Sequence, residues 1–228
     1  IDNPIFTRKG SEFSLGLQIT PPYSALNGKN YADVNMKDAE RYKFLEYHKW
    51  KLSAKTFTPL MAVNKTPVFM ARAEFAYIGH YNKNARTPFG TYMFGGDGMT
   101  GYSGYATEYI SMRGYETGSL TPYEYSNGVA IAQRAYLYDK ITMELRMPIS
   151  LEQSANIWAL GFVEAGNSFN KISDFSPFKL KRSAGLGVRI FLPMFGIMGI
   201  DWGYGFDPQV GESKAHGSQF HFVLGKEL

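Results

Sequence analysis

The chain has 228 residues and a formal net charge of +4, and its 24 lysines and arginines are scattered rather than gathered in one stripe, which disfavours a nucleic-acid partner. Cysteine is absent, so disulfides and thiol chemistry are excluded. No apolar run approaches the roughly 20 residues of a membrane helix, whereas a β-barrel, whose strands show lipid only every second side chain, is compatible with 44% hydrophobic and 16% aromatic residues.

Alternation of apolar and polar residues predicts eight strands of about ten or more residues each. In chain order they cover residues 11–20, 43–58, 67–80, 129–149, 156–168, 179–192, 197–206 and 218–227. In the seventh strand, Ile200, Trp202 and Tyr204 share one face. Asp201 and Gly203 lie on the other face. No helical periodicity competes with this pattern over a useful length.

The connections between these strands alternate between short and long. Short ones cover residues 59–66, 150–155 and 193–196, and longer ones cover residues 21–42, 81–128 and 170–178. Tight turns on one side of the membrane and longer loops on the other are typical of transmembrane barrels. A soluble β-sandwich also alternates, but its strands usually have about five or six residues. We therefore expect an all-β fold, a transmembrane antiparallel β-barrel.

The longest connection, residues 81–128, carries no strong strand pattern and is rich in glycine and aromatic residues. A loop of this length in a compact fold is usually functional or disordered. Its aromatic residues offer packing area and its glycines allow unusual backbone geometry. We therefore expect a folded loop that packs against the barrel interior.

This loop contains the triplet Arg113-Gly114-Tyr115, preceded by Met112 and by the pair Gly95-Gly96. The triplet resembles the (V/I)-R-G-(F/Y) motif of the bacterial surface antigen superfamily of outer-membrane assembly proteins, where it lies on a loop that folds back into the lumen. The resemblance extends over nearly the whole chain, including residues 3–11, 161–167, 181–187, 192–202 and 220–225. Two departures are Met112 in place of Val or Ile, and Leu228 where an aromatic residue is usual.

The resemblance implies that residues 1–228 are the C-terminal part of a sixteen-strand barrel of the bacterial outer membrane. Alone, this part would form an open, curved sheet unless it closed artificially. The absence of a starting methionine and a signal peptide agrees with a piece of a longer protein. The implied activity is the folding and insertion of β-barrel proteins. Its implied partners are outer-membrane lipid, unfolded barrel clients and accessory assembly lipoproteins, without a cofactor.

Two kinds of protein compete with this interpretation. A protein-secretion or translocation pore of the same superfamily would share the loop motif. A small eight-strand barrel could act as a passive channel or an anchor, but its interior has little room for a folded loop. We expect no enzyme, because the sequence contains no Ser/His/Asp arrangement, phosphate loop or metal-ligand spacing of its four histidines.

Arg113 is the first candidate site residue, because a guanidinium inside a barrel needs carboxylate partners. The resemblance implies that Glu164 and Glu144 supply them and hold the loop, either as part of the mechanism or only as a stabilising contact. Glu164 shares its alternation with Trp158 and Phe162. Either these large residues face the lumen, or a β-bulge changes the register.

The last strand is the second candidate, because Gly217, Phe220, Phe222 and Leu224 resemble the outer-membrane insertion signal and the closing strand of the superfamily. In that family the closing strand pairs weakly with the first strand, and such an edge can template an incoming strand. The alternative is an ordinary closing strand, which every outer-membrane barrel has.

Overall fold

The computed structural model describes residues 1–33, 35–63, 65–82, 86–99, 104–126, 128–152 and 154–225. Leu228 and the end of the last predicted strand, residues 226 and 227, lie outside these ranges. Three short helical segments occur in connections: α1 (Tyr23–Asn27), α2 (Asp38–Arg41) and η1 (Ile172–Asp174). None of the helices among the described residues is long and apolar enough to cross a membrane.

One antiparallel sheet of eight long strands dominates the structure, in the order β1-β2-β3-β8-β9-β10-β11-β12. The strands are β1 (Gly10–Ile19), β2 (His48–Pro59), β3 (Val68–Gly79), β8 (Leu137–Glu152), β9 (Ala155–Phe169), β10 (Lys181–Leu192), β11 (Gly196–Pro208) and β12 (Ala215–Leu224). Their lengths run from 10 to 16 residues, well above those of ordinary soluble strands. The expected all-β antiparallel fold is confirmed.

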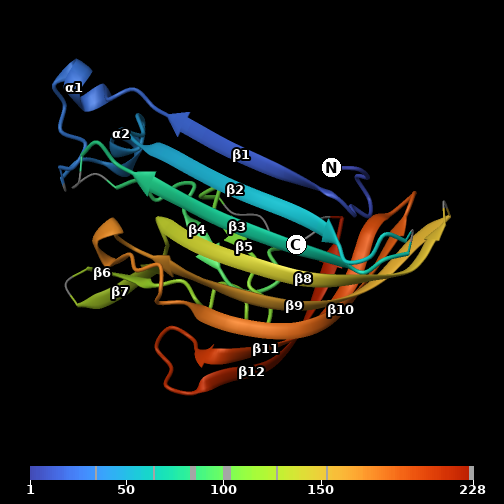
Figure 1. Ribbon diagram of the computed structural model, residues 1–228. Coiled ribbons are helices and arrows are strands. Elements are labelled where there is room, and N and C mark those ends of the chain that lie inside the picture. The colour runs from blue at the N-terminus through green and yellow to red at the C-terminus, as the bar shows by residue number, and fades with distance from the viewer. Residues whose placement is uncertain are drawn as a thin grey trace.

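The sheet curves strongly from β1 to β12 without closing on itself (Figure 1). Strands β1 and β12 are its two ends, and each pairs with only one neighbour among the described residues. An open, curved sheet is what the resemblance implied for this length of chain.

The two faces of the sheet differ in chemistry, because residues directly opposite each other in the ladder share a face. The face that carries Ile141, Leu186 and Phe220, called the outer face below, exposes large apolar side chains on strand after strand. The opposite, inner face carries Glu144, Glu164 and further buried charges: Lys49, Lys140, Arg146, Arg189 and Asp201. A soluble domain rarely exposes a continuous apolar surface of this extent, whereas a strand in a membrane barrel presents it to lipid.

The predicted strand 129–149 is wrong, because the structure divides it in two. Residues Val129–Gln133 form β7, which pairs with β6 (Tyr123–Ser126) in a separate two-stranded sheet, and β8 begins only at Leu137. Between them Ala135 exchanges backbone hydrogen bonds with Tyr92. Alternation alone could not reveal this break, because both pieces alternate. Similarly, β2 begins at His48 rather than at residue 43.

The long connection contains two further short strands, β4 (Tyr92–Phe94) and β5 (Glu108–Ile110), which pair in parallel and lie within the curve of the sheet (Figure 1). Residues 83–85 and 100–103 of this connection lie outside the described ranges. Its aromatic residues join a buried cluster with residues of β3 and β8: Ala76, Ile78, Tyr92, Phe94, Met112, Tyr115, Leu120 and Tyr138. The connection thus packs on the inner face, in the vicinity of the buried charges.

Candidate functional site

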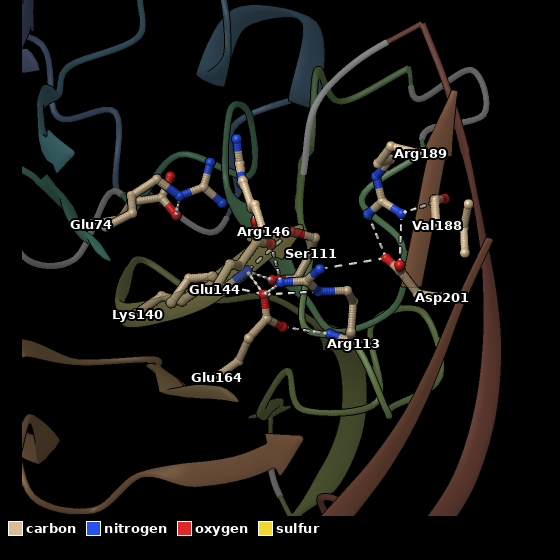
Figure 2. Close-up of polar contacts among 12 residues, drawn as sticks. Glu74, Ser111, Arg113, Lys140, Glu144, Arg146, Glu164, Val188, Arg189 and Asp201 are labelled. Carbon is tan, nitrogen blue, oxygen red and sulfur yellow. Dashed lines mark hydrogen bonds and ion pairs between the residues drawn. The ribbon is translucent and has the colours of Figure 1, made fainter. Parts of the chain in front are cut away.

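Arg113 is the centre of a buried charge network on the inner face, and its side chain has no exposed surface. Its Nε and Nη2 donate to Oε1 of Glu164 at 3.1 and 2.9 Å, and Nη2 also donates to Oε1 of Glu144 at 2.7 Å. Its backbone N–H donates to Oε2 of Glu164 at 2.8 Å. The structure therefore brings together the three charged residues named from the sequence (Figure 2).

A third carboxylate, missed in the sequence, lies on the remaining side of the guanidinium. Nη1 of Arg113 is 3.5 Å from Oδ2 of Asp201 on β11. Asp201 is an inner-face acidic residue between Gly199 and Gly203, and this isolated charge among glycines was the available sequence signal. The carboxylates come from β8, β9 and β11, so the motif joins three strands of the sheet.

Neighbouring cations balance these carboxylates. Lys140 lies 3.1 Å from Glu164, and Arg146 lies 2.7 Å from Glu144. Arg189 donates from both terminal nitrogens to the two oxygens of Asp201, each at 2.6 Å (Figure 2). Buried charges that are paired and hydrogen-bonded avoid the large desolvation cost of isolated ones.

The environment keeps Arg113 charged. Burial disfavours its charged form, but the charges of Glu164, Glu144 and Asp201 outweigh burial and raise the pKa of Arg113 above its usual range. Its guanidinium also lies over the ring of Phe162, 3.7 Å from the ring centroid. The group is thus held by charge, hydrogen bonds and an aromatic face.

The contact with Phe162 decides the question of alternation on β9. Trp158, Phe162 and Glu164 are all buried on the inner face. The pairing of β9 with β10 runs without interruption from Asn156 to Gly166, and the irregularity in its pairing with β8 lies farther along, between Pro148 and Ser150. The large residues therefore face inward without a bulge at Glu164. Phe162 lies beneath Arg113, whereas Trp158 packs against Phe6.

Gly114 brings the loop backbone into direct contact with β11. It has φ +85°, in the left-handed region that favours glycine. A Cβ atom added to Gly203 would lie 2.7 Å from the Gly114 nitrogen, and one added to Gly205 would lie 2.6 Å from the Gly114 oxygen. Glycines on both surfaces are what allow this approach.

Tyr115 and Gly114 extend the contacts to β10 and β12. The Tyr115 hydroxyl donates to the Arg182 carbonyl at 2.8 Å and accepts from the Asp207 N–H at 3.1 Å. Its ring stacks on His216 of β12, with centroids 5.7 Å apart. The Gly114 N–H donates to Nε2 of His221, also on β12, at 2.8 Å. Sequence reasoning missed His221, although its inner-face position opposite Asp201 follows from the alternation.

The residues named on the last strand lie elsewhere. Phe220, Phe222 and Leu224 project from the outer face with 65%, 61% and 64% exposure. Gly217 has φ +92° and lies opposite Gly205. The structure does not bring these four residues to Arg113; it places three of them on the apolar outer face of the last strand.

This arrangement can hold a loop in place, and it presents no nucleophile with an adjacent base. A curved sheet with an apolar outer face, a charged inner face and a loop folded onto the inner face is typical of part of an outer-membrane β-barrel. A family model described as the Omp85 superfamily domain matches residues 1–228, and the chain belongs to this superfamily. Members are assembly factors or transporters of outer membranes, bacterial or organellar, rather than classical enzymes.

The fold is similar to a solved relative, the crystal structure of BamA from Haemophilus ducreyi lacking POTRA domains 1-3. The match has a TM-score of 0.63 and 18% sequence identity, and it covers 97% of this chain but 39% of that chain. At this identity the similarity concerns the fold, and the chain spans well under half the length of this relative. A comparison with curated proteins gave no match.

Proposed function

We propose that the chain is the C-terminal part of the barrel of a bacterial outer-membrane assembly factor, which folds and inserts other β-barrel proteins. The observation that carries the proposal is the Arg113 network, which ties a folded loop to the inner face. The network lies beside the last strand, β12, one edge of which has no partner among the described residues. The similarity to a BamA fold supports this choice within the superfamily.

In the proposed mechanism, β12 offers its unpaired edge to an incoming client strand. Backbone N–H and C=O groups of such an edge can pair with another strand without nucleotide or covalent chemistry. Gly217, Phe220, Phe222 and Leu224 belong to the closing strand, and Phe220, Phe222 and Leu224 present their apolar side chains to outer-membrane lipid. Arg113, Gly114 and Tyr115, with Glu164 and Glu144, keep the loop docked while a client strand pairs with that edge. Accessory assembly lipoproteins would deliver clients to the whole protein.

The test is reconstitution of the whole protein in liposomes with an unfolded barrel client, followed by the rate at which the client gains protease protection. We expect the wild type to accelerate protected folding and Arg113→Ala to lose that acceleration. Arg134→Ala is the matched control, because Arg134 pairs with Glu124 outside the network, at 3.1 Å. An inactive wild type under conditions that fold a known assembly factor's clients would reject the proposal.

The second candidate function is a protein-secretion or translocation pore of the same superfamily, which the same loop motif favours. Ion conductance or translocation of a soluble substrate without client folding would select it. A small passive channel or anchor is a weaker alternative, because the described strands curve without closing and the loop packs on the inner face against β3 and β8.

A further inference from the structure

The two edges of the last strand, β12, differ in their backbone pairing. Its ladder with β11 runs along one edge, and its other edge has no partner among the described residues. The loop motif contacts β12 through His221, which accepts from the Gly114 N–H, and through His216, which stacks on Tyr115. His216 also forms a hydrogen bond with Gln209, at 2.5 Å. The motif thus reaches β12 chiefly through one directional hydrogen bond.

That hydrogen bond determines which ring nitrogen of His221 carries the proton. The Gly114 N–H is a donor, so Nε2 of His221 must accept and therefore carries no proton. A neutral imidazole then carries its proton on Nδ1. His221 is 4% exposed, so water cannot readily replace either partner. Loss of the acceptor would leave a buried backbone N–H unpaired.

We propose that His221 is a positioning residue that couples the loop motif to the last strand. Because the ring belongs to β12 and its Nε2 accepts from the Gly114 N–H, a tilt of β12 breaks one of the contacts that hold the motif against the sheet. Pairing of a client strand at the free edge would thereby be transmitted to the loop. This coupling rests on the proposed function, whereas the hydrogen bond itself does not.

The first test reads the tautomer of His221 in the whole protein in lipid, by nitrogen NMR of 15N-histidine. The His221 signal is the one missing from the His221→Gln spectrum. We expect an unprotonated Nε2 and a protonated Nδ1. A proton on Nε2 would overturn the proposal, because two donors cannot form this hydrogen bond.

The second test compares three substitutions by hydrogen exchange and by client folding. Gln places its side-chain oxygen at the position of Nε2, so His221→Gln keeps an acceptor, whereas His221→Leu removes it. Gln219→Leu is the matched control on the same face of β12, two residues away. We expect His221→Leu to speed exchange in residues 112–116 by about 3- to 10-fold, the effect of one ordinary hydrogen bond, and to slow client folding.

Rescue decides between coupling and simple packing. We expect His221→Gln to restore slow exchange and client folding, and Gln219→Leu to leave both unchanged. If His221→Gln and His221→Leu are equally impaired, the acceptor is not the relevant feature and the proposal is wrong. If neither the wild type nor any variant folds a client, the proposed function is wrong. The tautomer and the exchange rates then still test the hydrogen bond between Gly114 and His221.

Discussion

At the scale of single residues, the site is a balance of buried charges in which each carboxylate has at least two cationic neighbours. Glu164 forms ion pairs with Arg113 and Lys140. Glu144 forms ion pairs with Arg113 and Arg146. Asp201 forms ion pairs with Arg189 and Arg113. Removing one member exposes the others to the cost of an unpaired buried charge.

We predict that Glu164→Gln destabilises the folded protein by about 3–5 kcal/mol, because Arg113 and Lys140 lose their shared carboxylate in a dry environment. The measurement is urea unfolding in lipid. Glu12→Gln is the control, since Glu12 lies exposed on β1. Equal stability of Glu164→Gln and the wild type would mean that the network does not hold the loop in the lipid-embedded protein.

Glu108 gives the loop a second attachment, to β2, and a dependence on pH. It lies 2.7 Å from Nζ of Lys49 and 2.5 Å from Nζ of Lys51. Burial raises the pKa of Glu108, but the hydrogen bonds and charges of the two lysines outweigh it, so the pKa lies below its usual value. The Glu108 carboxylate therefore stabilises the folded loop fully at pH values above its unfolded-state pKa. This stabilisation disappears as the pH falls through the lowered pKa of the folded state.

We predict that hydrogen exchange in residues 104–112, corrected for the intrinsic rate, accelerates as pH falls from about 5 towards 3. This range begins above the unperturbed pKa of glutamate, about 4.3, and extends below it. Glu108→Gln should exchange faster at neutral pH and respond less to acid. An identical acid response in the variant and the wild type would assign the change to other carboxylates.

The partners of Arg113 show what sequence can provide at this scale. Glu144 and Glu164 followed from a family resemblance, although alternation left open whether Glu164 faces the lumen. Asp201 and His221 did not, because their importance depends on β11 and β12 curving until their inner faces meet Gly114. Curvature is a property of the whole sheet and leaves no pattern in a single strand.

At the scale of elements, glycines on β11 determine where the loop can lie. The strand alternates large outer residues with Gly199, Gly203 and Gly205 on its inner face. A sequence can show that this face lacks side chains, but not what occupies the space. The structure places the Gly114 backbone there.

We predict that Gly203→Ala displaces the loop and lowers stability by about 1–3 kcal/mol, the usual cost of forcing a methyl group into a packed contact. Gly16→Ala is the matched control, because its Cβ would meet Lys51 only at 3.6 Å, an ordinary contact. Limited proteolysis within the loop, together with thermal unfolding, measures both effects. Equal protease resistance in the two variants would show that the loop backbone does not rest on β11.

Strand positions were largely predictable, because alternation over ten or more residues reports a face directly. The break between β7 and β8 was not predictable, because the chain passes from one sheet to another at residues 134–136 while its alternation continues. What diverts it is the backbone pairing of Ala135 with Tyr92, a residue 43 positions earlier. Pairing at such a distance depends on the folded loop.

At the scale of the whole molecule, the sheet reverses the arrangement of a soluble domain, with charges inside and apolar side chains outside. The outer residues Ile141, Met143 and Leu145 of β8 are 43–46% exposed, and Leu186 of β10 and Phe220 of β12 are each 65% exposed. The same surface that would promote aggregation in water becomes favourable against hydrocarbon.

This reversal predicts which positions contact lipid, and the absence of cysteine allows a clean test with single substitutions. A fluorophore at Ile141→Cys, on the outer face of β8, should be quenched by brominated lipid and protected from aqueous iodide. A fluorophore at Lys55→Cys, on the inner face of β2 opposite Arg72, should respond more to iodide. Directly adjacent strand positions face opposite ways, so a fluorophore at Thr142→Cys, next to Ile141, should also not be quenched by brominated lipid. If Ile141→Cys and Thr142→Cys are quenched alike by lipid, the sheet does not stand in the bilayer with its apolar face outward.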